Sequence, residues 1–350
     1  MSGDRTAAPV DPGRWDPVQV TRVAAIDCGT NSIRLLIADR SPDGRTLTPV
    51  DRRLEMVRLG QGVDATGRFD PVALERTLAA TEAYAELCRA RGVEAVRFVA
   101  TSATRDAANR DEFLDGVRSR LGVPAEVISG TEEAALSFAG VLSGIGAQAP
   151  GPYLVVDIGG GSTELVLGRE SPTASVSMDI GSVRLTERHL RDDPPTQAQI
   201  DAASADARAA LDAAAARVPL GEVATLVGVA GSVTTVTAHA LRLDRYRPER
   251  IDGAELPVAA ALAACRSLLT MDRGERAALP YLHPGRVDVI AAGALVWCEV
   301  ITRVVAEAAA AGRHLIHVRA SEHDILDGIA LSAALPGPAG TSTGPSRDAE

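Results

Sequence analysis

Short apolar runs alternate along the chain with longer segments in which apolar residues recur at helical spacing. Residues 23–38 contain two apolar runs around a tight turn, and residues 153–168 repeat this arrangement, which predicts a β-hairpin in each. Further strands are expected at 52–59, 95–100, 126–128 and 226–231. Helical spacing predicts helices at 70–91, 109–121, 131–142, 201–216, 283–300 and 322–335. This order predicts an α/β chain of two similar domains, with a Gly/Ala/Pro linker over 144–152.

The two hairpin turns are copies of each other. Segment 26–32 (IDCGTNS) aligns with segment 156–162 (VDIGGGS) after a shift of 130 positions. A turn of small residues leaves backbone N–H groups free to bind phosphate oxygens. An Asp-x-Gly sequence is also a common hairpin turn, but two aligned copies favour a pair of phosphate loops facing across a cleft. The residues assigned to phosphate binding in these loops are Asp27, Gly29, Thr30, Asn31, Ser32, Gly159, Gly160, Gly161 and Ser162.

The two copies differ beside the turn, where the first has Arg34 and the second has Glu164. Asp157 and Glu164 together would hold Mg²⁺, directly or through water, because carboxylate oxygens are its preferred protein ligands. The structural alternative is that Glu164 is an exposed strand residue. We therefore expect the metal on the side of the second domain, with the first loop gripping phosphate.

Three further residues are candidates for chemistry. Arg105 and Asn109 lie four positions apart around a helix start, and an arginine there presents a planar fork to phosphate; the alternative is a solvated arginine near Asp106. Glu133 lies in the first turn of a predicted helix, where the helix dipole alone favours acids. Its functional alternative is a general base that activates water.

Composition excludes several classes of protein. All 36 basic residues are arginine, so a Walker-type ATPase and lysine Schiff-base chemistry are both excluded. Residues 21–130 carry 16 arginines and 16 acids, but residues 131–350 carry 18 arginines and 27 acids, which argues against a nucleic-acid-binding protein. The four cysteines lack metal-ligand spacing. No signal segment occurs in residues 1–20 and no apolar run of roughly 18 residues occurs anywhere, so a cytoplasmic protein without membrane association is expected.

Five blocks, taken in order, resemble the exopolyphosphatase/guanosine pentaphosphate phosphatase (Ppx/GppA) family, in the short form without extra C-terminal helical domains. The blocks are AIDCGTNSIRLLIAD (25–39), ATSATRDAANRDEF (100–113), VISGTEEAALSFAGV (127–141), VVDIGGGSTELVLG (155–168) and SEHDILDGIALS (321–332). Thr30 departs mildly from the serine that other members often carry. The resemblance implies two ribonuclease H-like domains of the actin/Hsp70/sugar kinase superfamily, with a cleft between them.

The resemblance also implies an organisation of the chain. Residues 1–20 would be a disordered segment, 21–130 the first domain, 131–321 the second domain and 336–350 a disordered tail. The helix at about 322–335 would return to the first domain.

The resemblance implies roles as well. Glu133 matches the general base, Asp157 and Glu164 match metal positions, and Arg105 and Asn109 match positions near the substrate phosphates. The expected activity is release of terminal orthophosphate from inorganic polyphosphate with Mg²⁺ or Mn²⁺. Hydrolysis of guanosine pentaphosphate or nucleoside triphosphates stays open, as do a nucleotide-binding switch with little turnover, a sugar or acetate kinase, and a homodimer. The acidic second domain favours short polyphosphate chains.

Overall fold

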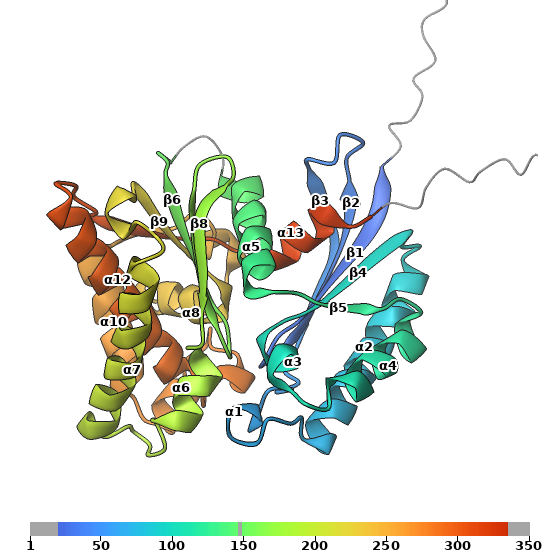
Figure 1. The fold of residues 1–350 in the computed structure, drawn as a ribbon, viewed down its shortest axis with the longest axis horizontal. Helices are drawn as coiled ribbons and strands as arrows, with labels where there is room; N and C mark the ends of the chain where they lie inside the picture. Colours follow the sequence, from blue (N-terminus) through green and yellow to red (C-terminus); the bar gives the residue numbers. More distant parts are fainter. Residues whose placement is uncertain (1–19, 146–148, 335–350) are drawn as a thin grey trace, which may run out of the picture.

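The computed structural model describes residues 20–145 and 149–334. The predicted disordered segments at 1–20 and 336–350 therefore lie outside the described residues, apart from the exposed Val20. Two mixed β-sheets stand side by side with helices packed on both (Figure 1). No helix in the described ranges is long and apolar enough to cross a membrane.

The first sheet has the strand order β3-β2-β1-β4-β5. Its strands are β1 (Thr21–Cys28), β2 (Ile33–Arg40), β3 (Leu47–Glu55), β4 (Ala95–Ala100) and β5 (Ala125–Val127). The first three strands are antiparallel, whereas β4 and β5 run parallel to β1. The helices of this domain are α1 (Val63–Thr66), α2 (Pro71–Ala90), α3 (Ser102–Asp106) and α4 (Arg110–Leu121).

The second sheet has the order β10-β11-β9-β6-β7-β8. Its strands are β6 (Tyr153–Ile158), β7 (Thr163–Gly168), β8 (Pro172–Met178), β9 (Thr225–Val229), β10 (Glu255–Pro257) and β11 (His317–Ala320). Reading from β8 to β11 reproduces the order and directions of the first sheet, and β10 adds an antiparallel edge. The duplication expected from the two hairpins therefore extends through whole sheets.

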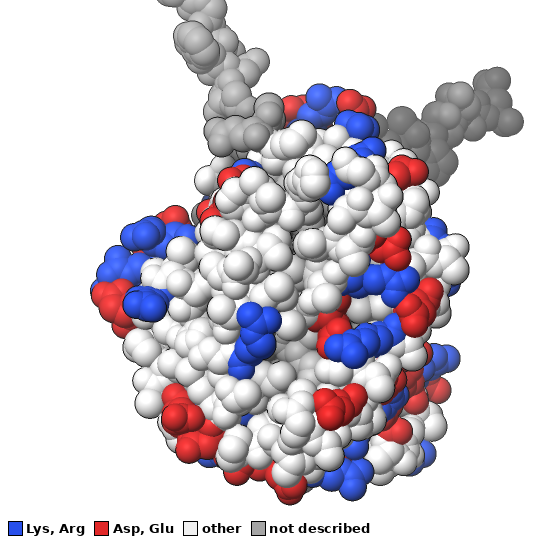
Figure 2. Space-filling view, turned by 90° about the vertical axis from the view of Figure 1, so that its left-hand side faces the viewer, with Lys and Arg blue, Asp and Glu red and all other residues white. Residues whose placement is uncertain are grey.

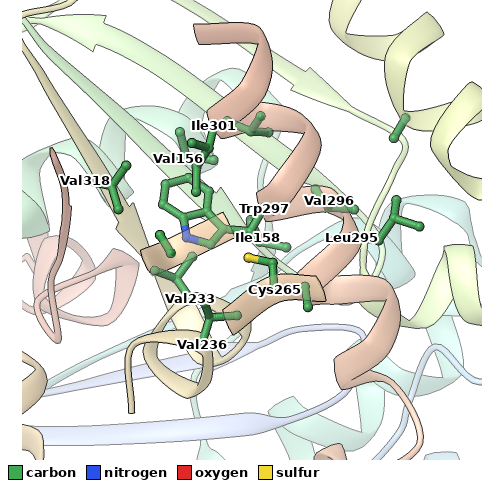
Figure 3. Close-up of a cluster of buried hydrophobic side chains, with 14 of the residues drawn as sticks. Val156, Ile158, Val233, Val236, Cys265, Leu295, Val296, Trp297, Ile301 and Val318 are labelled. Atoms are coloured by element: carbon green, nitrogen blue, oxygen red, sulfur yellow. The ribbon is translucent and has the colours of Figure 1, made fainter. Parts of the chain in front are cut away.

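The helices of the second domain surround its sheet (Figure 1). They are α6 (Ser182–Arg188), α7 (Gln197–Ala215), α8 (Ala230–Ala240), α9 (Pro248–Ile251), α10 (Val258–Thr270), α11 (Arg273–Ala277) and α12 (Ile290–Ala310), with 3-10 turns η2 (Leu220–Glu222) and η3 (Pro284–Arg286). Trp297 of α12 lies at the centre of the core, among Val156, Val233 and Val318 (Figure 3). Its ring needs Gly228 on β9, because a Cβ there would lie 2.9 Å from the indole.

Two helices cross between the sheets, α5 (Gly130–Ile145) and α13 (Ile325–Ser332) (Figure 1). Helix α5 packs on β6, β7 and β8, whereas α13 packs on β1 and β2. Their backbones approach closely at two glycines. A Cβ at Gly140 would lie 1.8 Å from the carbonyl oxygen of Asp324, and one at Gly328 would lie 2.0 Å from that of Leu136. We keep a domain boundary near residue 130 as a prediction.

The bounds of several predicted elements differ from those in the structure. The strand expected at 52–59 is β3 at 47–55, an edge strand with many exposed side chains and therefore little apolar pattern. The helix expected at 283–300 begins at Ile290 and extends to Ala310, because η3 precedes it and an alanine-rich turn continues it. The last helix is shortened to Ile325–Ser332 by a capping box formed by Asp324 and Asp327. The helix expected at 201–216 begins earlier, at Gln197.

The outer face of the second domain shows arginines and acids interspersed over a mainly uncharged surface (Figure 2). Phosphate-backbone binding requires clustered cations along a face. This view shows no continuous basic stripe among the residues it colours.

Candidate active site

The two predicted phosphate loops come together at one cavity of about 90 Å³ between the domains. Loop 1 (residues 29–32) follows β1 and loop 2 (residues 159–162) follows β6. Both have the same internal geometry, because the first glycine N–H donates to the carbonyl oxygen of the serine three residues later at 3.0 Å in each. Every residue assigned to phosphate binding in these loops lines the cavity, and so do Glu133 and Asp157.

The carbonyl oxygens of both loops are bound by the segments behind them. In loop 1, the N–H of Gly60 donates to Thr30 at 2.8 Å and that of Arg58 donates to Asn31 at 2.9 Å. In loop 2, residues 182–184 hold the carbonyls of residues 159–161. The N–H groups of Thr30, Asn31, Ser32, Gly160, Gly161 and Ser162 donate no hydrogen bond within the described residues. Each loop thus offers three backbone donors to phosphate oxygens.

The tips of the loops touch in this structure. A Cβ at Gly161 would lie 2.6 Å from both Thr30 Oγ1 and Ser102 Oγ, and one at Gly160 would lie 2.9 Å from Thr30 Cβ. Glycine is therefore required here because another domain's side chains pack against the backbone, and a larger residue would push the loops apart.

Glu133 lies in the first turn of α5, where its backbone N–H donates to Ser129. It is 8 % exposed, and its Oε2 accepts a 2.7 Å bond from Arg105 Nη1, which also donates to the carbonyl of Ile128. Burial raises the pKa of Glu133 from 4.5 to about 7, against the lowering effect of Arg105 and with help from Asp157 and Asp27. A carboxyl group with this pKa exchanges protons near neutral pH, as a general base must.

Asp27 and Asp157 have different partners across their hairpins. In the first domain, Asp27 is paired in register with Arg34, whose Nε and Nη2 donate to it at 3.0 and 2.7 Å. In the second domain, Asp157 is paired in register with Glu164, a second acid. Burial raises the pKa of Asp157 to about 6, although Ser137 Oγ donates to it at 2.5 Å. The first hairpin therefore carries an ion pair where the second carries two neighbouring carboxyl groups.

Glu164 lies behind the cavity, not on its wall. It is 1 % exposed and accepts a 2.7 Å hydrogen bond from Ser177. Burial, followed by the charges of Glu133 and Asp157, raises its pKa well above the ordinary value. A protonated Glu164 would add no negative charge beside Asp157. Its role as a metal ligand stays a prediction.

Arg105 and Asn109 are separated by the structure. Arg105 contacts Glu133 as described, although its side chain does not form the cavity wall. Asn109 does not line the cavity. Its Oδ1 instead accepts a 2.8 Å hydrogen bond from the N–H of Phe69, within the first domain. Contact of Asn109 with substrate stays a prediction without a supporting contact.

Two arginines on the cavity wall were given no role by the sequence analysis. Arg34 also binds Asp324 at the start of α13, and so links the first hairpin to the crossing helix. Arg286 of η3 forms no ion pair with a carboxylate in the described ranges; its side chain lies beside Tyr246, and burial lowers its pKa. A partly buried guanidinium without a carboxylate partner, on a wall of N–H donors, is suited to an anion. The position of Arg286 on the cavity wall could not be predicted from the sequence, because no local pattern marks a 3-10 turn.

A third small-residue segment also reaches the cavity. Ala230, Gly231 and Ser232 form the junction between β9 and the first turn of α8, and Ala230 has a left-handed φ of 67°. The strand expected at 226–231 ends instead at Val229, and these three residues had no predicted function. The start of α8 adds its free N–H groups and the positive end of its dipole to the same cavity.

The donor set fits a divalent cation only in part. No group of three or more His, Cys, Asp or Glu residues is arranged to hold a metal in the described part of the chain. Mg²⁺ needs no such cage, because it keeps several waters and binds one or two carboxylates together with substrate phosphates. Asp157 and Asp27 provide carboxylates on the cavity wall for such a cation.

Comparison with known proteins agrees with this geometry. The chain is 50 % identical to exopolyphosphatase 2 of Mycobacterium tuberculosis over 322 residues, 90 % of this chain and 99 % of that protein. The crystal structure of an exopolyphosphatase-like protein superposes with a TM-score of 0.85 at 48 % identity, over 89 % of this chain and 98 % of that one. An Aquifex aeolicus Ppx/GppA protein gives 0.73 at 29 % identity, over 90 % and 97 %. These neighbours confirm the expected two-domain fold of the actin/Hsp70 type. Residues 36–332 match the Ppx/GppA phosphatase family, and the chain therefore belongs to that family.

Proposed function

We propose that this protein is an exopolyphosphatase that releases orthophosphate from the end of inorganic polyphosphate. The observation that carries the proposal is the position of Glu133, a buried carboxyl group with a pKa near 7 on the wall of a cavity lined by two phosphate loops. The mycobacterial relative named exopolyphosphatase 2 supports the choice of substrate.

In the proposed reaction the terminal phosphoryl group lies between the loops. The N–H groups of residues 30–32 and 160–162, with Arg34 and Arg286, bind its non-bridging oxygens and spread the charge of the transition state. Glu133 accepts a proton from a water molecule, which attacks phosphorus as the bond to the leaving phosphate chain breaks. Arg105 orients the Glu133 carboxylate and favours its charged form. Catalysis of this kind is mainly positioning and electrostatics.

We propose Mg²⁺ or Mn²⁺ as the cofactor, held by Asp157 and Asp27 with Glu164 behind them. When bound, such an ion would neutralise part of the phosphate charge. The fit is supported by the two carboxylates on the cavity wall, Asp157 and Asp27. Burial raises the pKa of both groups, and only Asp27 has an arginine, Arg34, bonded directly to it.

A second candidate substrate is a nucleoside-capped phosphate chain such as guanosine pentaphosphate or a nucleoside triphosphate. A cavity of about 410 Å³ adjoins the first and shares Arg34, Gly231 and Arg286 with it. Its wall combines apolar and aromatic side chains with arginines: Leu54, Tyr246, Pro280, Tyr281, Leu282, Arg52 and Arg53. Such a wall suits an organic leaving group, whereas polyphosphate would use only the arginines.

The other candidate functions have less support. A nucleotide-binding switch has no need of Glu133 beside the phosphate loops, and a sugar or acetate kinase would need an acceptor in place of water. Buried free cysteines fit a reducing cytoplasm, which we propose as the location. A homodimer stays a prediction.

The test is phosphate release measured side by side on short polyphosphate, long polyphosphate, guanosine pentaphosphate and ATP. We expect the highest kcat/KM on short polyphosphate. Dominant turnover of guanosine pentaphosphate or ATP would favour the second candidate. Tight nucleotide binding without phosphate release from any of the four would favour the switch, and phosphoryl transfer to an added acceptor would favour the kinase.

A further inference from the structure

Helix α6 follows β8 and binds all three glycine carbonyls of loop 2. The backbone N–H of Ser182 donates to Gly159 at 3.0 Å, and those of Val183 and Arg184 donate to Gly160 at 2.9 and 3.1 Å. The third carbonyl, of Gly161, has a side-chain partner, because Arg184 Nε donates to it at 2.7 Å. The orientation of the last loop peptide therefore depends on one side chain.

The other two nitrogens of Arg184 cross to the first domain. Nη1 forms an ion pair with Asp64 of α1, and Nη2 forms one with Asp106 of α3 at 2.6 Å. Nη2 also lies 3.4 Å from Ser102 Oγ, which packs against Gly161. The guanidinium of Arg184 is therefore held on three sides, by Gly161, Asp64 and Asp106. The side chain is only 11 % exposed.

These contacts lie at the edge of the interface opposite the crossing of α5 and α13 (Figure 1). Arg188 of α6 also binds Asp64, and Glu187 accepts the N–H of Gly62 at 3.0 Å. Any opening of the domains about the crossing helices would break these contacts first. Arg184 belongs to this group and also holds Gly161. One guanidinium therefore both bridges the two domains and orients loop 2.

We propose that Arg184 is a positioning residue that couples closure of the domains to the geometry of loop 2. When Asp64 and Asp106 hold its terminal nitrogens, Nε is fixed against the Gly161 carbonyl and the peptide N–H of Ser162 faces the cavity. When the domains separate, the guanidinium loses both anchors and the loop loses its fixed donor. The inference rests on the proposed phosphate-hydrolysing function, but it holds for any anhydride substrate that binds between the loops.

The geometry requires arginine specifically. A guanidinium presents Nε and both Nη atoms in one plane, so it can bind a carbonyl and two carboxylates at once, whereas the lysine ammonium is a point donor. Arg184→Lys should therefore keep an ion pair across the interface and lose the bond to Gly161. Arg184→Gln should lose both.

The matched control is Arg188, one helical turn further along α6. It binds the same Asp64, at 2.7 and 2.9 Å, but contacts no loop carbonyl. Arg188→Gln thus removes an interdomain ion pair of similar kind without touching loop 2.

The experiment measures kcat and KM for the wild type and the three variants on whichever anhydride the wild type hydrolyses best. Hydrogen bonds to charged groups make the expected loss of kcat roughly 10- to 100-fold for both Arg184 variants, and Arg188→Gln should keep a kcat close to wild type. KM should rise in Arg184→Gln and Arg188→Gln, which both weaken closure, and less in Arg184→Lys. Wild-type kcat in Arg184→Lys, or equal losses in Arg184→Gln and Arg188→Gln, would overturn the proposal.

A second measurement does not depend on activity. Amide hydrogen exchange at residues 182–184 reports the bonds from α6 to loop 2. We expect faster exchange there in Arg184→Gln and not in Arg188→Gln, and equal exchange in the two variants would overturn the proposal. If the wild type hydrolyses none of the anhydrides while this exchange difference is present, the proposed function fails and the positioning role of Arg184 stands.

Discussion

Replacing Glu133 with glutamine should stabilise the folded protein at neutral and alkaline pH. The glutamine side chain has nearly the shape of the protonated carboxyl group and carries no charge. The wild-type group, by contrast, must ionise inside the protein, where burial and the charges of Asp157 and Asp27 oppose its negative charge. Residues selected for catalysis at the expense of stability behave in this way.

The magnitude follows from the pKa. A carboxyl group whose pKa rises from 4.5 in the unfolded chain to about 7 in the folded protein favours the protonated form on folding. Its contribution is intact below pH 4.5 and is lost as pH rises through 7. Because a pKa difference of one corresponds to about 1.4 kcal/mol, the loss reaches about 3 kcal/mol at about pH 7–8 and is below about 1 kcal/mol at about pH 5.

Thermal unfolding at pH 5 and pH 8 measures this difference in protein free of substrate and metal. At pH 8 the melting temperature of Glu133→Gln should exceed that of the wild type by roughly 6–12 °C, and at pH 5 the gap should nearly close. Glu132→Gln is the control, because Glu132 is an exposed neighbour paired with Arg97 at the surface. A variant that is less stable than the wild type at pH 8, or a gap independent of pH, would show that ionisation of Glu133 does not destabilise the fold.

Three further predictions concern the same site and its scaffold. Arg105→Gln removes the charge that lowers the pKa of Glu133, so the acid limb of the kcat/KM profile should move to higher pH by about one unit; an unmoved limb would contradict the role of Arg105. Gly140→Ala places a Cβ against the carbonyl of Asp324 and should lower the free energy of unfolding by about 1–3 kcal/mol in urea titrations, whereas no loss would show that α5 and α13 can separate freely. Chelation with EDTA should abolish phosphate release and added Mg²⁺ or Mn²⁺ should restore it, whereas undiminished release in excess EDTA would exclude the cofactor.

The parts of the fold that were predictable are those with a local signal. The hairpins around Asp27 and Asp157 combine apolar runs with small-residue turns, and the structure places both turns on one cavity wall. The edge strand β3 was misplaced because its exposed side chains follow no apolar pattern, and β8, α6 and α10 were not predicted. Val57 and Leu59, which suggested a longer strand, are instead buried beside the segment that holds loop 1.

The candidate site was predictable where residues follow a repeat or a family motif. Glu133 and Asp157 line the cavity, and Arg105 reaches it through Glu133. Arg286 was not predictable, because it is brought to Arg34 from the other end of the chain by folding alone. The same holds for Arg184, since its partners Asp64 and Asp106 belong to the other domain. Asn109 belongs to a family motif, but its side chain accepts a hydrogen bond from the backbone of Phe69 and does not line the cavity.

The role proposed for Glu133, activation of the water that attacks the terminal phosphate, can be tested by steady-state kinetics. Initial rates of phosphate release from short polyphosphate should be measured for the wild type, Glu133→Gln and Glu132→Gln at pH 8 with saturating Mg²⁺. We expect kcat of Glu133→Gln to fall roughly 10²–10⁴-fold with KM little changed, and Glu132→Gln to keep a rate close to wild type. Turnover of Glu133→Gln near the wild-type rate would contradict this role.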